Sequence, residues 1–162
     1  MQVFMLEYGE TLQVVLFFSL LPALLALERV LPFRRPEPDS ARLRTNFALT
    51  ALAIACMPLV PVSFITAAFW AQERGLGLFN YLNLSEPALI AATLFVRAFI
   101  SFGTHFLNHK IPWLWRLHRV HHIDTELDVS STVRFHPLEM PVGAMIGVPA
   151  VVVFGLSPWV LS

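Results

Sequence analysis

The stretch PALIAATLFVRAFISFGTHFLNHKIPWLWRLHRVHH, residues 87–122, joins a long apolar run to a group of histidines. The apolar run extends to about residue 104 with a single charge, Arg97, and is close to the roughly 20 residues needed to cross a bilayer. Five of the six histidines in the chain follow at once, and His136 is the sixth. Neutral imidazole is the commonest protein metal ligand near neutral pH. The stretch therefore predicts a metal centre at the end of a membrane helix.

The spacing of the first five histidines supports this interpretation. His105 and His109 are four residues apart, and His118, His121 and His122 stand at i, i+3 and i+4. Side chains at these offsets share one face of a helix. His121 and His122 point about 100° apart on such a helix. They can therefore serve two metals, or one can bind metal while the other supports it.

The remaining polar residues of this segment leave alternatives open. His136 precedes Pro137, so we expect an extended backbone there, and both a ligand role and an ordinary role stay open for it. All-imidazole ligand sets suit iron, zinc or copper. Three carboxylates, Asp124, Glu126 and Asp128, follow the second histidine group and can orient a ligating imidazole. Acidic residues in a polar loop are more often simply solvated, and we favour that interpretation.

Composition places the whole chain in a membrane. Hydrophobic residues make up 56% of the 162 residues and charged residues 14%, with a mean hydropathy of +0.65. Ordinary soluble domains are less apolar and more charged. The formal net charge is zero, which gives no reason to expect a nucleic-acid partner. We predict one all-α domain over residues 1–162, an integral membrane helical bundle of about four transmembrane helices, at residues 11–27, 47–71, 87–104 and 140–161.

Basic residues predict the orientation of this bundle. A polar linker at residues 28–46 contains five arginines, and its prolines should prevent a helix. The histidine segment contains four more basic residues, Lys110, Arg116, Arg119 and Arg134. Two spans separate the two regions, so both should face the cytoplasm. The compact loops favour a bacterial inner membrane.

Several short motifs occur together between His105 and Glu139. They are His105 with His109, Pro112, Leu114-Trp115, His118-Arg119-Val120-His121-His122 and Arg134-Phe135-His136-Pro137-Leu138-Glu139. With these motifs the sequence resembles the fatty acid hydroxylase / sterol desaturase superfamily of membrane-bound di-metal oxygenases. The resemblance implies a non-haem di-iron centre that uses O2 and an electron-donor protein to hydroxylate or desaturate a C–H bond of a fatty acyl or sterol-like lipid. It implies that the metal ligands are His105, His109, His118, His121 and His122, with His136 as a ligand or near neighbour.

The sequence departs from the family pattern in three places. Phe106 stands where members usually have arginine, and Ala98 stands near where they tend to have aspartate. A third histidine group, expected beyond a further pair of spans, does not occur before Ser162. We therefore expect a member of the family truncated at its C-terminus, or a fragment of a longer protein, with an incomplete site and doubtful activity.

Other functions also fit the histidine pattern. A membrane protein that binds one zinc or iron without oxygenase activity is the main alternative. A haem-binding bundle would need histidines on facing spans, whereas these lie in one segment that follows a span. A structural remnant of an enzyme is a further possibility.

Overall fold

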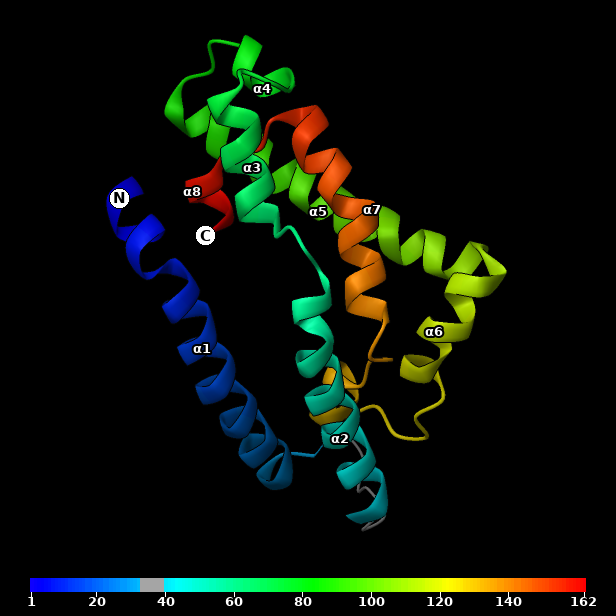
Figure 1. Ribbon diagram of the computed structural model, residues 1–162. Coiled ribbons are helices and arrows are strands. Elements are labelled where there is room, and N and C mark those ends of the chain that lie inside the picture. The colour runs from blue at the N-terminus through cyan, green and yellow to red at the C-terminus, as the bar shows by residue number, and fades with distance from the viewer. Residues whose placement is uncertain (33–39) are drawn as a thin grey trace. The chain divides into compact units, whose positions relative to one another are not determined.

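The computed structural model describes residues 1–32 and 40–162 of the chain (Figure 1). About 80% of the described residues are helical, and none of them lies in a strand. The prediction of an all-α membrane bundle is confirmed. In chain order the helices are α1 (Gln2–Val30), α2 (Ser40–Cys56), the 3₁₀ helix η1 (Met57–Leu59), α3 (Phe64–Glu73), α4 (Leu78–Tyr81), α5 (Glu86–Lys110), α6 (Pro112–His122), the 3₁₀ helix η2 (Val129–Val133), α7 (Glu139–Phe154) and α8 (Pro158–Leu161).

Three segments of the described chain are long and apolar enough to cross a membrane. They contain the first three predicted spans, and their bounds are Gln2–Val30, Ser40–Tyr81 and Glu86–Lys110. The second segment is not one straight helix. Helix α2 ends at Cys56 and α3 begins at Phe64, where the Ser63 hydroxyl accepts a hydrogen bond from the backbone N–H of Thr66 at 3.1 Å.

The fourth predicted span, residues 140–161, is divided in the structure. Helix α7 has 16 residues, so it is about 24 Å long at 1.5 Å per residue, against a hydrocarbon core of about 30 Å. It ends at Gly155, whose φ of 65° favours glycine, and the N–H groups of Gly155 and Leu156 both donate to the carbonyl of Val151. Whether α7 crosses a membrane stays a prediction.

The predicted linker at residues 28–46 is shorter than expected. Helix α1 continues to Val30 and α2 begins at Ser40, while residues 33–39, which include two of the five arginines, lie outside the described residues. The interpretation of residues 40–46 as a helix-free linker is wrong. Arg42 lies in the first turns of α2, and its side chain forms ion pairs with the carboxylates of Asp124 and Asp128.

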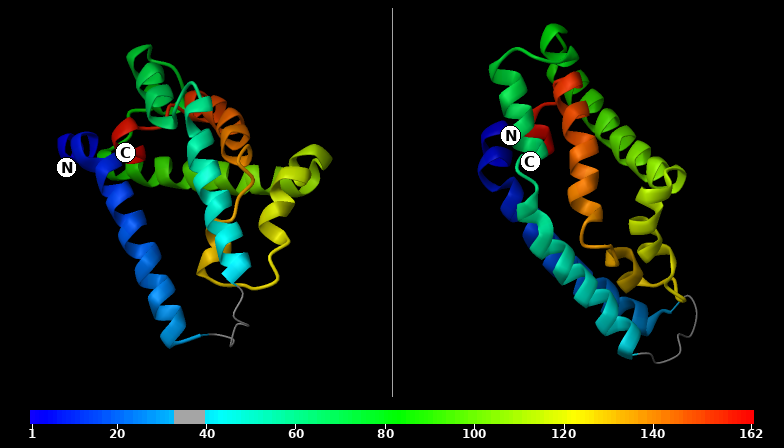
Figure 2. Two further views of the ribbon diagram at one scale, coloured as in Figure 1. Left: turned by 60° about the horizontal axis from the view of Figure 1, so that its bottom comes forward. Right: turned by 45° about the vertical axis from the view of Figure 1, so that its right-hand side comes forward.

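The described residues form two compact units, and α1, α5 and α7 contribute to both. The first unit comprises Met1–Glu10, Leu59–Leu107 and Val142–Ser162. In this unit α7 packs closely against α5 and α3 (Figure 2). A Cβ at Gly147 would lie 2.6 Å from the ring of Phe64, so a larger residue here would have to displace that ring. The apolar core cluster of this unit consists of Ala67, Ala68, Val96, Ile100, Val151 and Leu156.

Arg97 belongs to this first unit. Its guanidinium carbon lies 4.9 Å from the centre of the Phe64 ring. A cation over an aromatic face is attracted by the ring quadrupole. The charge of Arg97 therefore packs against α3 within this unit.

The second unit comprises Thr11–Pro58 and Asn108–Pro141. Helix α2 packs against η2, and the backbone N–H of Val129 donates to the Glu28 carboxylate of α1 at 2.9 Å. A capping box between Asp128 and Ser131 begins η2. This unit contains α6, which carries three of the histidines, and the segment that follows it.

Candidate metal centre

Helix α5 supplies the first two histidines of the site. It ends at Lys110, because Ile111 is extended (φ −94°, ψ 119°) in front of Pro112. His105 and His109 stand one turn apart near this end, and both are exposed. The sequence predicts this shared face, and the structure confirms it; Pro112 accounts for the helix end.

Helix α6 reverses the chain and brings the next histidines to the same place. Pro112 occupies its first turn, a position that proline favours. His118 and His122 follow at i and i+4. His118 is buried, with 2% of its surface exposed, and His122 is exposed.

Four histidines converge at this helix reversal. His105, His109, His118 and His122 each offer one ring nitrogen, and these four atoms lie within 4.8 Å of one another. The rings of His109, His118 and His122 are 4.8 Å apart in each pairing. The Nε2 atoms of His118 and His122 are 3.1 Å apart. We call these residues the four-histidine group.

The other two histidines lie outside the four-histidine group. The ring of His121 is stacked on Phe135, with centroids 5.5 Å apart and planes 6° apart. Its Nδ1 is buried with no hydrogen-bond partner among the described residues. The Nδ1 of His136 accepts the backbone N–H of Leu138 at 3.1 Å. Their assignment as metal ligands stays a prediction that the geometry does not support.

A carboxylate completes the surroundings of the buried histidine. Oε1 of Glu139 lies 2.6 Å from Nδ1 of His118. Burial, together with the nearby His109 and His121, lowers the pKa of His118 from 6.5 to about 4. His118 is therefore neutral near pH 7, as a metal ligand must be. Sequence reasoning gave Glu139 no role, although it closes the RFHPLE phrase that carries part of the family resemblance.

Trp115 is also part of these surroundings. Its ring centroid is 5.3 Å from that of His109 and 5.7 Å from that of His122. Trp115 therefore packs against two members of the four-histidine group. The indole therefore shields one side of these imidazoles.

Two of the acidic residues proposed to be solvated are buried in an ionic network. The side chain of Asp124 is 2% exposed, and that of Asp128 is 14% exposed. Arg42 of α2 binds both, with Nη1 at 3.2 Å from each carboxylate oxygen of Asp124 and Nη2 bonded to Asp128. The solvated interpretation is therefore wrong for these residues, because an arginine distant in the sequence neutralises them.

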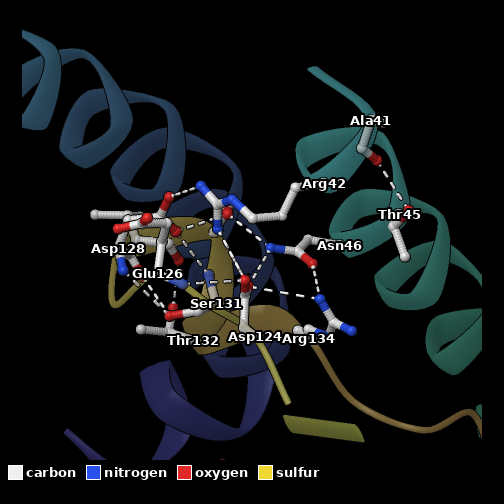
Figure 3. Close-up of polar contacts among 12 residues, drawn as sticks. Ala41, Arg42, Thr45, Asn46, Asp124, Glu126, Asp128, Ser131, Thr132 and Arg134 are labelled. Carbon is white, nitrogen blue, oxygen red and sulfur yellow. Dashed lines mark hydrogen bonds and ion pairs between the residues drawn. The ribbon is translucent and has the colours of Figure 1, made fainter. Parts of the chain in front are cut away.

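Asn46 connects this network (Figure 3). Its amide nitrogen donates to Asp124 at 2.7 Å and to Ser130 at 2.9 Å, and its oxygen accepts from Arg134 at 2.9 Å. Asn46 is fully buried, with 0% of its surface exposed. We call Arg42, Asn46, Asp124, Asp128 and Arg134 the Asp124 network.

Hydrogen bonds also set the pKa values in this network. Burial alone would raise the pKa of Asp124, but hydrogen bonds from Asn46 and Arg42 outweigh it and lower the pKa below 3.8. Burial opposes ionisation of Asp128 too, and bonds from Arg42, Ser130 and the Ser131 N–H lower its pKa. Both carboxylates are therefore ionised near pH 7.

A known protein family matches the part of the chain that contains the four-histidine group. Residues 90–162 match the family model described as fatty acid hydroxylase. This part of the chain is therefore similar to fatty acid hydroxylases. The match covers all six histidines and α6, α7 and α8, and it confirms the resemblance seen in the sequence. No curated protein and no solved structure matches the chain significantly.

The match to the fatty acid hydroxylase family model gives the site its context. The family modifies lipids and is typically metal-dependent, and the four-histidine group can hold a metal ion. The three long apolar helices indicate a membrane protein. The four-histidine group, the family match and the apolar helices are therefore all consistent with a lipid-modifying membrane protein.

Proposed function

We propose that the chain is an O2-dependent, non-haem di-iron oxidoreductase that hydroxylates or desaturates a C–H bond of a fatty acyl or sterol-like lipid in lipid biosynthesis. An electron-donor protein would supply the reducing equivalents. The observation that carries the proposal is the convergence of four imidazoles within 4.8 Å in the region that matches the fatty acid hydroxylase family model.

The donor set of the four-histidine group fits such a metal. All four donors are imidazole nitrogens, a ligand type that suits iron and zinc. The carboxylate of Glu139 faces the outer nitrogen of His118, an arrangement that ligating histidines almost always have. Bound iron would supply the chemistry of O2 activation, while these side chains fix its position.

Different observations support the individual ligands. His105, His109, His118 and His122 are proposed from their convergence. His121 and His136 are proposed only by resemblance to the family. Neither belongs to the group of converging ring nitrogens.

The surface of α5 supports a lipid substrate. Four phenylalanines on this helix, at i, i+4, i+7 and i+11, share one face that approaches His109. All four are largely exposed, and an apolar chain in the bilayer can lie against them. They are Phe95, Phe99, Phe102 and Phe106.

The location of the site follows from charge. The exposed basic residues of α6, Arg116 and Arg119, lie beside the four-histidine group in sequence. Basic residues near the ends of spans favour the cytoplasmic side. We therefore propose a bacterial inner-membrane enzyme with its histidines at the cytoplasmic face.

A second function has one observation in its favour. The four-histidine group is large enough for a single metal ion, and the other two histidines are engaged elsewhere. A membrane protein that holds one zinc or iron without oxygenase activity would need no more than this.

Metal content and lipid products distinguish the two proposals. The chain would be purified in detergent and its metal measured, with the His109→Ala/His122→Ala double variant as control. About two iron atoms per chain would support the oxygenase, and one zinc would support the binding protein. Cells expressing the chain should also contain a hydroxylated or newly unsaturated lipid that is absent with the double variant. If iron is bound but no such lipid forms, the oxygenase proposal fails.

A further inference from the structure

The segment Arg134–Glu139 follows one side of α6. Arg134 and Phe135 contact the last turn of the helix, and Glu139 contacts the turn before it. The contacts are Nε of Arg134 to the carbonyl of Val120 at 2.8 Å, Phe135 to the ring of His121, and Glu139 to His118. Helix α6 is therefore contacted on this side by residues that are not members of the four-histidine group.

Among these contacts, the one at His118 has a direct chemical consequence. The two ring nitrogens of His118 face different partners: Nδ1 is 2.6 Å from Oε1 of Glu139, and Nε2 is 3.1 Å from Nε2 of His122. A neutral imidazole carries one proton, and its position is set by the hydrogen bond that the other nitrogen makes. A carboxylate accepts, so the proton belongs on Nδ1 and the lone pair of Nε2 faces the four-histidine group.

We propose that Glu139 is a positioning residue, whose carboxylate accepts the Nδ1–H of His118 and so fixes the ring and the tautomer that direct Nε2 toward a metal ion. The inference rests on the proposed metal site, but the hydrogen bond itself does not require a metal. It also gives the RFHPLE phrase a physical role that does not depend on His136 as a ligand.

The local fold prepares Glu139 for this role. A turn at His136 places it: the Glu139 N–H donates to the His136 carbonyl at 2.9 Å, and the Leu138 N–H donates to the His136 ring. Glu139 is then the first residue of α7. A negative charge is favoured at this end of a helix by the helix dipole. His136 therefore shapes the turn that delivers the carboxylate.

A measurement without metal tests the hydrogen bond. Two-bond ¹⁵N–¹H NMR correlations distinguish the two tautomers of a histidine ring. In the metal-free protein in detergent, His118 should be in the Nδ1–H form, assigned by its loss in His118→Ala. Glu139→Ala should lose that preference, whereas Glu126→Ala, a matched carboxylate in the loop, should keep it. If wild type shows the Nε2–H form, the proposal is overturned.

A double-mutant cycle with Co²⁺ tests the consequence for metal binding. Glu139→Ala should weaken Co²⁺ binding about 10- to 100-fold, the usual effect of removing such a partner. Glu139→Gln, whose amide oxygen can still accept, should recover most of the affinity. In a His118→Ala background Glu139→Ala should cause no further loss, because it acts through His118. A further loss of equal size would mean that Glu139 binds metal itself or only supports the fold, and would overturn the proposal.

The two proposals fail differently. If wild type binds neither iron nor Co²⁺, the proposed metal site is wrong, and the positioning role toward metal falls with it. The tautomer measurement still decides whether Glu139 controls His118. If wild type binds Co²⁺ but Glu139→Ala binds it equally well, the metal site stands and only the positioning role is lost.

Discussion

The Asp124 network and the four-histidine group assemble polar side chains in opposite ways. The Asp124 network combines two arginines, two aspartates and one asparagine, so each buried charge meets an opposite charge or a hydrogen-bonding amide. The four-histidine group combines four side chains of one kind around a small volume. Neutral imidazoles do not form ion pairs with one another.

This difference separates a structural site from a binding site. A network whose partners are all protein groups can stabilise the fold without any ligand, because its buried charges are paired. Closely spaced imidazoles gain most from a cation that binds their lone pairs. The comparison predicts that damage to the Asp124 network reduces stability, and that damage to the four-histidine group reduces metal affinity.

The largest expected effect is on stability. Asp124→Ala removes the carboxylate that Arg42, Asn46 and Arg134 share. Removing one partner of a buried ion pair costs about 3–5 kcal/mol, so thermal unfolding in detergent should occur at a much lower temperature. Asp128→Ala should cost less, because Asp128 is more exposed.

The same variants test the separation of the two sites. Any Asp124→Ala protein that remains folded should bind Co²⁺ as tightly as wild type. A stable Asp124→Ala protein with weakened Co²⁺ binding would place Asp124 in the metal site and end the comparison.

The next effect is on metal affinity, with neighbouring histidines as matched variants. His122→Ala removes a member of the four-histidine group and should weaken Co²⁺ binding by at least about 100-fold, more than the loss of a supporting partner. His121→Ala should change it much less, because His121 stacks on Phe135. Isothermal titration calorimetry measures both. Equal losses would show that His121 is also a metal ligand, as the family resemblance implies.

The sequence predicts the helices of the site better than it predicts the site. The i, i+4 spacing and Pro112 correctly predict the end of α5 and the start of α6, because these are local rules. The choice between His121 and His122 is not local. It depends on which face of α6 meets α5 and which meets Phe135, and both histidines are compatible with the helical spacing.

The sequence also fails to reveal the partners of two carboxylates, for a similar reason. Asp124 looks like a solvated loop residue because Arg42 and Asn46 are distant in the sequence. Glu139 receives no role because it meets His118 only after the intervening loop and η2 return the chain to α6. Pairings between distant segments are set by tertiary packing, and spacing within one segment does not reveal them.

The smallest expected effect is a pH dependence that belongs to the Asp124 network. The pKa values of Asp124 and Asp128 are lower in the folded chain than the ordinary value of 3.8. The unfolded chain therefore binds protons first as the pH falls, and folding stability decreases below about pH 3.8, through the lowered pKa values. Above that pH the contribution is complete. Arg42→Gln removes the cation that faces both carboxylates and so raises their folded-state pKa values toward that of the unfolded chain. The variant should therefore be less stable than wild type near neutral pH, and its stability should fall less as the pH decreases. Thermal unfolding in detergent at a series of pH values measures both profiles, and coincident profiles would show that Arg42 does not stabilise these charges.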